Sequence, residues 1–448
     1  MFNKLYEYSL NKTNTIAIET TNYAITYGQL YKLICRNRRH LMNKGVFKKT
    51  VVYKVKNQAA FICNMLSLLS AECWVVPVPP DVNPRFPSAL QNAILIDSDF
   101  FIESNENDES DEGLLEANDQ LCGIYHMTSG STGYVKFCKR SLRALMLEGF
   151  AYQKLFSLNE SRILSMAPIY HSFALGAAAF SSLVSGSQLK LVEKFIPRKM
   201  VSIITTWNAN IVIGVPLMID AIARVSIDTT VSFPSLKAIL SGTGNVTKEV
   251  QDLVKRRFGI HVSVNYGSTE TGGILSRLSE EPHDSIGKEM SGVEIKIIHK
   301  EGRESKINED GEAYVKSPYM MSEYAYEKNP FIDGYFPMGD ILKKDESGYY
   351  YIIGRIKNFI DIGGRKVNPL IIQEKILEYP GTKDCVVSKG IRKNGSIFIQ
   401  AIVEGESINV DDIRRYLSLT LDPYQIPSSI KVVNKLKRNT VGKYIKNE

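Results

Sequence analysis

The chain has little cysteine and no long apolar run, and each absence excludes a class of protein. Six cysteines among 448 residues form no CxxC pair and show no metal-ligand spacing, so the sequence predicts neither a disulfide framework nor a zinc site. No stretch approaches the ~18 consecutive apolar residues of a membrane-spanning helix, and the first residues lack the basic start and apolar run of a signal peptide. We therefore expect a cytoplasmic protein with reduced thiols and no transmembrane segment.

What is present is the composition of an ordinary globular chain. Hydrophobic residues make up 44% of the sequence and charged residues 23%, and this balance excludes a disordered or fibrous protein. The length is enough for about three average domains. Basic residues exceed acidic residues by 7, and residues 355–448 hold all of this excess, with 17 Lys and Arg against 10 Asp and Glu. Such an excess fits acidic partners, among them nucleotides, nucleic acid and anionic lipid, and it fits equally a surface charge that only keeps the protein soluble.

Short apolar runs alternate with segments of helical spacing over the first part of the chain. Runs rich in β-branched residues and bounded by turn residues predict strands, and apolar residues three and four positions apart predict helices. The predicted strands are Val51–Val55, Trp74–Val78, Ile94–Ile96, Ile211–Val215, Ala238–Leu240 and His261–Asn265, and the predicted helices are Phe61–Ser70, Ser141–Phe156 and Lys248–Phe258. This alternation predicts an α/β protein with mostly parallel sheets.

The pattern changes twice toward the C-terminus. From about Gly292, short strands and turns predict a β-rich subdomain, with strands at 294–298, 311–316 and 349–353. After Gly354 the pattern is strand, helix and strand again, with a helix from Pro369 through Leu377. We expect a large N-terminal domain of stacked α/β subdomains plus the β-rich subdomain, residues 1–354, followed by a small α+β domain, residues 355–448.

The most distinctive local sequence is a run of small hydroxyl and glycine residues, Thr128 to Gly133, that ends near Lys136. Free N–H groups and hydroxyls in such a loop can surround phosphate oxygens while the lysine supplies positive charge. A generic Ser/Gly/Thr turn fits these residues equally well. A Walker A loop is excluded, because it needs Gly, four residues and then Gly-Lys-Ser/Thr.

Other segments carry weaker signals. The turn after Leu240 lacks the third glycine of a dinucleotide-binding fingerprint, but it would let a flat base approach the backbone. At the exit of the next predicted strand, Tyr266 could stack on a purine and Glu270 could hold Mg²⁺, although a plain loop is the simpler interpretation. Taken alone, Asp340 and Arg355 indicate a surface ion pair.

In order and spacing, these segments and Asn439 to Lys443 resemble the motifs of the acyl-activating, adenylate-forming superfamily. That superfamily includes acyl-CoA synthetases, adenylation domains of nonribosomal peptide synthetases, and firefly luciferase. Two earlier segments also match it: Ile25 to Leu30 is similar to the family's "TYxEL" segment, and Val75 to Pro80 to its "xxVPxxP" strand. The resemblance therefore runs nearly end to end, and it implies that the C-terminal domain is a mobile lid.

The resemblance also implies a role for each matching residue. It implies ATP- or AMP-binding roles for Thr128, Ser129, Gly130, Ser131, Thr132, Gly133, Gly242, Thr243, Tyr266, Gly267, Ser268, Asp340 and Arg355; a magnesium ligand in Glu270; catalytic roles for Lys443, Lys136 and Thr269, and for His171 as the aromatic gate of the acid pocket; a hinge at Lys357; and a tunnel for the pantetheine of CoA beside Gly363 and Gly364.

Three residues depart from the family pattern. Val135 and Phe137 flank Lys136 where the family has Pro and Gly, and Met338 precedes Gly339-Asp340 where the family has Thr. The segment between Pro80 and Thr128 is shorter than usual, which predicts a trimmed N-terminal subdomain. The implied ligands themselves stay in place.

The expected activity is that of an ATP-dependent carboxylic acid:CoA ligase of fatty acid metabolism type, which uses ATP, Mg²⁺ and CoA and has no nucleic-acid partner. No acidic residue lies between Arg162 and Glu193 to pair with an α-ammonium group, so amino acids are disfavoured as substrates. The small residues from Gly176 to Ala179 would leave room for an alkyl chain or ring, or they serve ordinary helix packing. Two alternatives stay open: a ligase that loads an acyl carrier protein, and a catalytically weakened nucleotide-binding relative.

Overall fold

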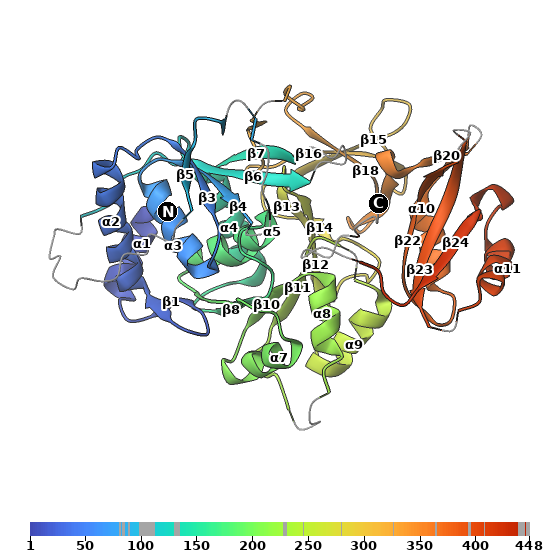
Figure 1. Ribbon diagram of the computed structural model, residues 1–448, viewed down its shortest axis with the longest axis horizontal. Coiled ribbons are helices and arrows are strands. Elements are labelled where there is room, and N and C mark those ends of the chain that lie inside the picture. The colour runs from blue at the N-terminus through green and yellow to red at the C-terminus, as the bar shows by residue number, and fades with distance from the viewer. Residues whose placement is uncertain are drawn as a thin grey trace. The chain divides into compact units, whose positions relative to one another are not determined.

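Most of the chain is described by the computed structural model in Figure 1. The described residues are 1–79, 82, 86–87, 90–97, 113–129, 135–226, 231–244, 246–278, 280–325, 327–362, 365–392, 396–406, 408–437 and 444. They form two compact units, one of residues 1–294 with 315–336 and one of residues 295–314 with 337–448. The predicted domain boundary at residue 354 falls inside the second unit. It stays a prediction, because it separates a segment that is expected to move from the rest of the chain, whereas the two units are groups of residues that pack together.

The largest sheet of the first unit is mainly parallel. Among the described residues it has nine strands, and its antiparallel strand pairs lie only at the two ends of the sheet. In spatial order the strands are β14 (Lys288–Glu289), β13 (Gly272–Arg277), β12 (Val262–Ser268), β11 (Ala238–Ser241), β10 (Ile211–Gly214), β8 (Arg162–Ser165), β9 (Gln188–Leu191), β1 (Ile16–Glu19) and β2 (Ala24–Thr26). The prediction of a mostly parallel α/β fold is confirmed.

A second sheet of the first unit carries the predicted phosphate loop at one of its turns. Its strands are β17 (Glu323–Tyr324), β7 (Val135–Ser141), β6 (Gly123–Ser129), β4 (Trp74–Val78), β3 (Thr50–Lys54) and β5 (Ile94–Ile96) in spatial order. The pairs β6–β4, β4–β3 and β3–β5 are parallel, while β6, β7 and β17 are antiparallel neighbours. The loop from residue 130 to 134 that joins β6 to β7 lies outside the described residues.

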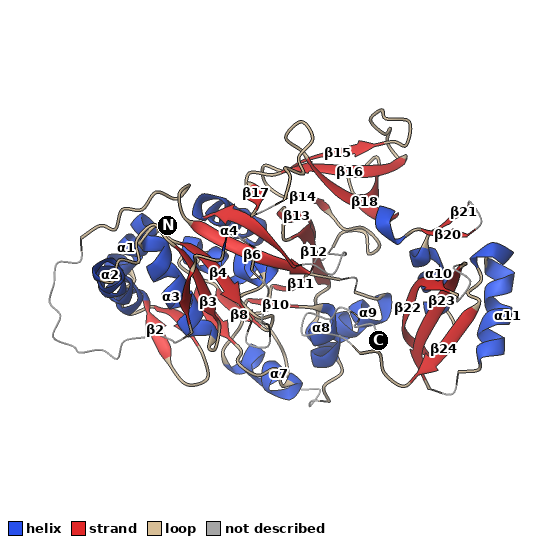
Figure 2. Cartoon of the chain, turned by 45° about the horizontal axis from the view of Figure 1, so that its top comes forward, coloured by secondary structure: helices blue, strands red, loops and turns tan. Residues whose placement is uncertain are grey.

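Helices cover both faces of the large sheet, as Figure 2 shows. In β10 the side chains of Ile211 and Ile213 join one core and that of Val212 joins the other, which explains why this strand is apolar at every position. The helices of the first unit are α1 (Phe2–Asn11), α2 (Tyr27–Asn43), α3 (Gln58–Ser70), α4 (Leu142–Phe156), α5 (Ser172–Ala174), the π-helix η2 (Leu175–Phe180), α6 (Ser181–Ser185), α7 (Pro197–Thr206), α8 (Pro216–Ala223) and α9 (Lys248–Phe258).

Local capping explains where several helices begin. Asn57, Ser141 and Thr247 each accept a backbone N–H bond from the residue three positions ahead, at the starts of α3, α4 and α9. Helix α9 ends at Gly259, which has φ of +75° and supplies the left-handed cap that other residues adopt only with strain. Its ends coincide with the predicted ones, since both signals are local.

The second unit contains the predicted β-rich and α+β segments. Its larger sheet has the order β15 (Glu294–Ile298), β16 (Asp310–Lys316), β18 (Phe336–Lys344) and β19 (Tyr350–Arg355), followed by η3 (Ile356–Asn358) and the pair β20 (Ile360–Ile362) and β21 (Arg365–Val367). A last sheet of β22 (Thr382–Ile391), β23 (Ile397–Gly405) and β24 (Ser429–Val433) packs with α10 (Pro369–Leu377) and α11 (Val410–Thr420) around its own core, and a short turn, η4 (Pro423–Gln425), precedes β24.

The cysteines and the helices give two further findings. All six cysteines are free and buried. Over the described part of the chain, no helix combines the length and the apolar character needed to cross a membrane.

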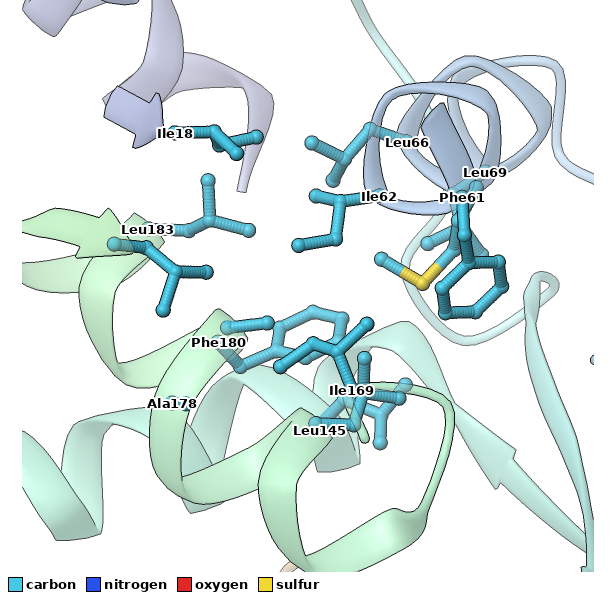
Figure 3. Close-up of a cluster of buried hydrophobic side chains, with 14 of the residues drawn as sticks. Ile18, Phe61, Ile62, Leu66, Leu69, Leu145, Ile169, Ala178, Phe180 and Leu183 are labelled. Atoms are coloured by element: carbon cyan, nitrogen blue, oxygen red, sulfur yellow. The ribbon is translucent and has the colours of Figure 1, made fainter. Parts of the chain in front are cut away.

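The main core lies where α3, α4 and η2 meet. Figure 3 shows the Phe180 ring among side chains of α3, with Leu145 and Ile169 close by. Phe180 is fully buried, and a Cβ at Gly149 would lie 2.8 Å from its carbonyl carbon, so α4 and η2 pack at backbone contact. The alanines that follow Gly176 are buried members of this same core, which supports helix packing rather than room for a substrate.

Replacing Phe180 by alanine should leave a cavity in this core. We expect Phe180→Ala to lower the free energy of unfolding by about 3–5 kcal/mol, because the surrounding side chains cannot relax enough to fill the space that the ring occupies. Leu10→Ala, at a side chain that is 62% exposed, is the control and should change it by less than about 0.5 kcal/mol. Chemical denaturation measures both, and equal effects of the two changes would contradict this account of the core.

Candidate functional site

The hairpin of β6 and β7 places the first predicted motif. Thr128 and Lys136 are directly paired across the two strands, so their side chains lie on the same face of the sheet. Several predicted site residues fall outside the described residues, and their roles remain predictions; these are Gly130, Ser131, Thr132, Gly133, Gly363, Gly364 and Lys443. The side chain of Ser129 is likewise outside the described part.

Lys136 is held by two groups that the sequence did not single out. Its Nζ lies 2.5 Å from Oε2 of Glu327 and 4.8 Å from the centre of the Tyr324 ring. The lysine side chain is 24% exposed and that of Glu327 is 33% exposed, so the pair is partly screened by water. A phosphate group that binds Lys136 therefore either displaces the Glu327 carboxylate or binds the lysine alongside it.

Tyr324 also contacts the predicted magnesium ligand. Its hydroxyl donates a hydrogen bond to Oε1 of Glu270 at 2.9 Å, and the backbone N–H of Met321 donates to the carbonyl of Glu270 at 2.7 Å. Burial and the Glu270 carboxylate raise the pKa of Tyr324, so its hydroxyl keeps the proton that it donates. One short strand, β17, thereby brings Lys136 and Glu270 together.

Tyr324 and Glu327 could not be found from the sequence. The bond from Tyr324 to Glu270 spans 54 positions, and that from Lys136 to Glu327 spans 191. Strand β17 has only two residues, too few to show a period. No local pattern marks either residue.

The end of β12 and the turn that follows it carry Tyr266 to Thr271 and are tightly built. A Cβ at Gly267 would lie 2.1 Å from the carbonyl oxygen of Gly272, so only glycine fits there. Ser268 and Thr271 exchange hydrogen bonds, with each side chain accepting from the other's backbone N–H at 3.1–3.2 Å. This turn fixes the direction in which Thr269 and Glu270 leave the sheet.

The segment before η2 reaches the same turn. The hydroxyl of Ser172 donates to that of Thr269 at 3.3 Å, and the preceding His171 lies with its ring 4.8 Å from that of Tyr170. A Cβ on Gly242, at the end of β11, would lie 2.6 Å from the ring of Phe173. His171, Gly242 and Thr269 are thus joined through residues 172 and 173. The π-helix that follows is a rare element, frequent at functional sites.

A buried histidine that the sequence did not single out lies beside these groups. His126 is on β6 two residues before Thr128, it is 2% exposed, and its Nε2 has no hydrogen-bond partner among the described residues. Burial lowers its pKa first, and the positive charge of Arg140 and the nearby His171 lower it further. The imidazole is therefore neutral at pH 7.

Predicted residues of the second unit form their own pair. Asp340 on β18 is in register with Arg355 on β19, and Nε of Arg355 donates to Oδ1 of Asp340 at 2.6 Å. The Asp340 side chain is 8% exposed and that of Arg355 is 53% exposed. Lys357 follows in the exposed turn η3, where no residue is buried. The ion pair predicted from the residues is present, and the hinge stays a prediction.

The state of His126 should make stability depend on pH. The unfolded chain protonates this residue near its ordinary pKa of about 6.5, while the folded protein keeps it neutral to lower pH, so the unfolded state binds more protons. The free energy of unfolding should fall as pH drops below about 6.5, by up to about 1.4 kcal/mol per pH unit. His126→Gln should remove this part of the pH dependence.

Urea denaturation of both proteins at about pH 5.5 and about pH 7.5 measures the effect, because the two values bracket the ordinary histidine pKa. His40→Gln is the matched control, a histidine lost from an exposed position of α2. Identical pH dependence in wild type and His126→Gln would contradict a neutral, buried His126.

Comparison with known proteins extends these observations to the whole chain. The chain is 25% identical to a feruloyl-CoA synthase from Amycolatopsis sp, over 96% of this chain and 94% of that one. It is 26% identical to a 2-succinylbenzoate–CoA ligase from Listeria monocytogenes serotype 4b, over 99% and 90%. Its fold matches that of the o-succinylbenzoate CoA synthetase MenE from Bacillus subtilis in complex with ATP and magnesium ion, with a TM-score of 0.84 at 21% identity over 99% and 98% of the chains.

A second structure of MenE, in complex with the acyl-adenylate intermediate OSB-AMP, also gives a TM-score of 0.84. The model of the AMP-binding enzyme family matches residues 87–325. This range is more than half of the chain, and it includes the hairpin of β6 and β7, the turn after β12 and strand β17. The two relatives named above are a CoA synthase and a CoA ligase. The chain belongs to the AMP-binding enzyme family.

Proposed function

We propose that the protein is an ATP-dependent carboxylic acid:CoA ligase, which converts a fatty or other non-amino acid to an acyl-adenylate and then to an acyl thioester. The observation that carries the proposal is the cluster in which Tyr324 contacts both Lys136 and Glu270. It supports the proposal because it brings a lysine and a carboxylate together beside the hairpin of β6 and β7. Relatives that are similar over nearly their whole length are CoA ligases, which supports the same reaction here.

In the first half-reaction a carboxylate oxygen of the acid bonds to the α-phosphorus of ATP, and the bond from that phosphorus to pyrophosphate breaks. Both reactants are anions, so the barrier falls when fixed positive charge neutralises the developing charge. Lys136 and Lys443 supply that charge. The hydroxyl of Thr269, fixed by Ser172 at 3.3 Å, is placed beside the α-phosphate.

The residues present fit a magnesium ion bound largely through the nucleotide. Among the described residues, no group of three or more His, Cys, Asp and Glu side chains is close enough to hold a metal. Mg²⁺ commonly takes one or two carboxylates and completes its shell with phosphate oxygens and water. Glu270, oriented by Tyr324 and Met321, is that carboxylate. When bound, the ion neutralises phosphate charge.

The family resemblance of the motifs supports the remaining nucleotide contacts that we propose. Gly242 and Thr243 line the adenine edge, Tyr266 stacks on the base, and Asp340 with Arg355 binds the ribose hydroxyls. Gly242 and Thr243 directly follow β11, which is parallel to both of its neighbours. In such sheets, ligands bind in crevices beyond the carboxyl ends of the strands.

In the second half-reaction the sulfur of a thiol bonds to the acyl carbon, and the bond from that carbon to the oxygen of AMP breaks. We propose that residues 355–448 act as a lid that turns about Lys357, which carries Lys443 away and opens a path for the thiol beside Gly363 and Gly364. Domain closure of this kind uses a few hinge residues in loops or at the ends of elements. Lys357 suits this role, because it lies in the short exposed turn η3. The excess of positive charge on these residues suits the phosphates of CoA.

The acid is one without an α-ammonium group. The described part of the stretch from His171 to η2 holds no carboxylate to pair with a buried ammonium, and an unpaired one would be strongly disfavoured. His171 acts as the gate of the acid pocket. We place the activity in the cytoplasm and in fatty acid metabolism, with CoA rather than an acyl carrier protein as the acceptor.

Lys443→Ala separates the two half-reactions. Removing the lysine should abolish acid-dependent release of pyrophosphate, while thioester formation from supplied acyl-adenylate and CoA continues at a rate within a few-fold of wild type, because that step does not need its charge. Lys446→Ala, three positions on, is the control and should leave both steps unchanged. Undiminished pyrophosphate release in Lys443→Ala would show that this lysine is not catalytic. Thioester formed on a holo carrier protein but not on CoA would contradict the proposed acceptor.

A further inference from the structure

Behind the site lies a fully buried ion pair. Arg140 on β7 and Glu148 on α4 are 0% and 1% exposed, with Nη2 of the arginine 2.6 Å from Oε2 of the glutamate. Neither residue belongs to a motif that the sequence singled out. Isolated buried charges are strongly disfavoured, so a pair like this persists only where its geometry is well satisfied.

The pair binds two further segments of backbone. The second carboxylate oxygen of Glu148 accepts a hydrogen bond from the N–H of Gly273 at 2.9 Å. Nε and Nη2 of Arg140 donate to the carbonyl oxygen of Tyr319 at 3.0 and 2.7 Å. Charge-assisted bonds of this kind are stronger than neutral ones. The four segments, β7, α4, β13 and the stretch before β17, therefore meet at one pair of side chains.

The surrounding glycines make room for this arrangement. A Cβ at Gly176 would lie 2.4 Å from the Glu148 carboxylate, and one at Gly272 would lie 2.9 Å from it and 3.0 Å from Arg140. Gly272 also has φ of +69°, a left-handed conformation that favours glycine. The backbone thus approaches the pair so closely that a side chain at Gly176 or Gly272 would collide with the Glu148 carboxylate.

Both anchored segments lead directly to Glu270. Gly273 lies in β13, three residues after it. Tyr319 is two residues before Met321, whose N–H donates to the Glu270 carbonyl, and five before Tyr324, whose hydroxyl donates to the Glu270 carboxylate. Arg140 and Glu148 therefore hold the two pieces of chain that orient Glu270.

The cluster is not fully satisfied, which separates its role from simple stabilisation. Nη1 of Arg140 and the hydroxyls of Tyr152 and Tyr319 are buried with no hydrogen-bond partner among the described residues. Burial and the Glu148 carboxylate raise the pKa of both tyrosines. Apolar residues of similar size often replace a buried ion pair without loss of stability, so stability alone does not explain this one.

We propose that Arg140 and Glu148 are positioning residues. They hold the segment from Ser268 to Gly273 in place and thereby, through Glu270, set the affinity of the protein for Mg·ATP. The inference rests on the proposed function in its assignment of Glu270. Residues that orient a metal ligand typically change metal affinity or activity 10- to 100-fold when they are removed. The effect is expected in adenylation and not in the thioester step.

The first test is Glu148→Gln, which keeps the shape but removes the charge. In the ligand-free protein, amide hydrogen exchange in residues 268–274 should speed up at least tenfold while exchange in α9 stays at the wild-type rate. Calorimetry should show Mg·ATP binding weakened about 10- to 100-fold. The matched control is Glu19→Gln, which breaks the ion pair with Lys190 at the far side of the same large sheet and should change neither quantity.

The second test is the double variant Arg140→Met with Glu148→Leu, which removes both charges at similar volume. We expect a moderate loss of thermal stability, because the N–H of Gly273 and the carbonyl of Tyr319 lose their partners. Pyrophosphate release should fall about 10- to 100-fold, and thioester formation from supplied acyl-adenylate should keep its wild-type rate. Equal loss in the two half-reactions, or wild-type exchange in residues 268–274 in both variants, would overturn the positioning role. If the wild-type protein activates no acid, only the proposed function is refuted. The positioning role can still be tested, because hydrogen exchange in residues 268–274 is measured without substrate.

Discussion

The buried contact between Arg140 and Glu148 is the interaction that the geometry of the site depends on. It joins strand β7, the helix that packs on η2, the start of β13 just after Glu270, and the stretch that leads into β17. Each of these segments is ordinary in isolation. Because charged groups in a buried position tolerate little displacement without losing their partners, the pair restricts all four segments to one arrangement.

Strand β17 transmits this arrangement to the reacting groups. It pairs with β7 through Tyr324 and Cys138, so the tyrosine is placed by backbone hydrogen bonds, and its ring and hydroxyl then contact Lys136 and Glu270. The lysine that we propose to meet phosphate and the carboxylate that we propose to meet magnesium are thus in contact with one side chain. A site that is largely formed before substrate binds loses little free energy to reorganisation when charge develops.

The sequence predicts those parts of the fold whose causes are local. Helix α9, strand β15 and helix α10 have the predicted ends, because caps, turn glycines and apolar periods lie within a few residues of them. The residues that complete the site could not be predicted in the same way. Glu148 looks like one polar position of a helix, and only the fold brings it to Arg140 and Gly273. The alanines after Gly176 fitted either a pocket or helix packing in the sequence, and in the fold they belong to the buried core with η2.

The central claim is that the protein activates a carboxylic acid by adenylation. ATP–pyrophosphate exchange with radiolabelled pyrophosphate, measured with Mg²⁺ and a panel of fatty, aryl and amino acids, tests it most directly. We predict exchange that requires a fatty or aryl acid and is absent with amino acids. Absence of exchange with every acid, in a protein that still binds Mg·ATP, would contradict the claim and indicate a nucleotide-binding protein without ligase activity.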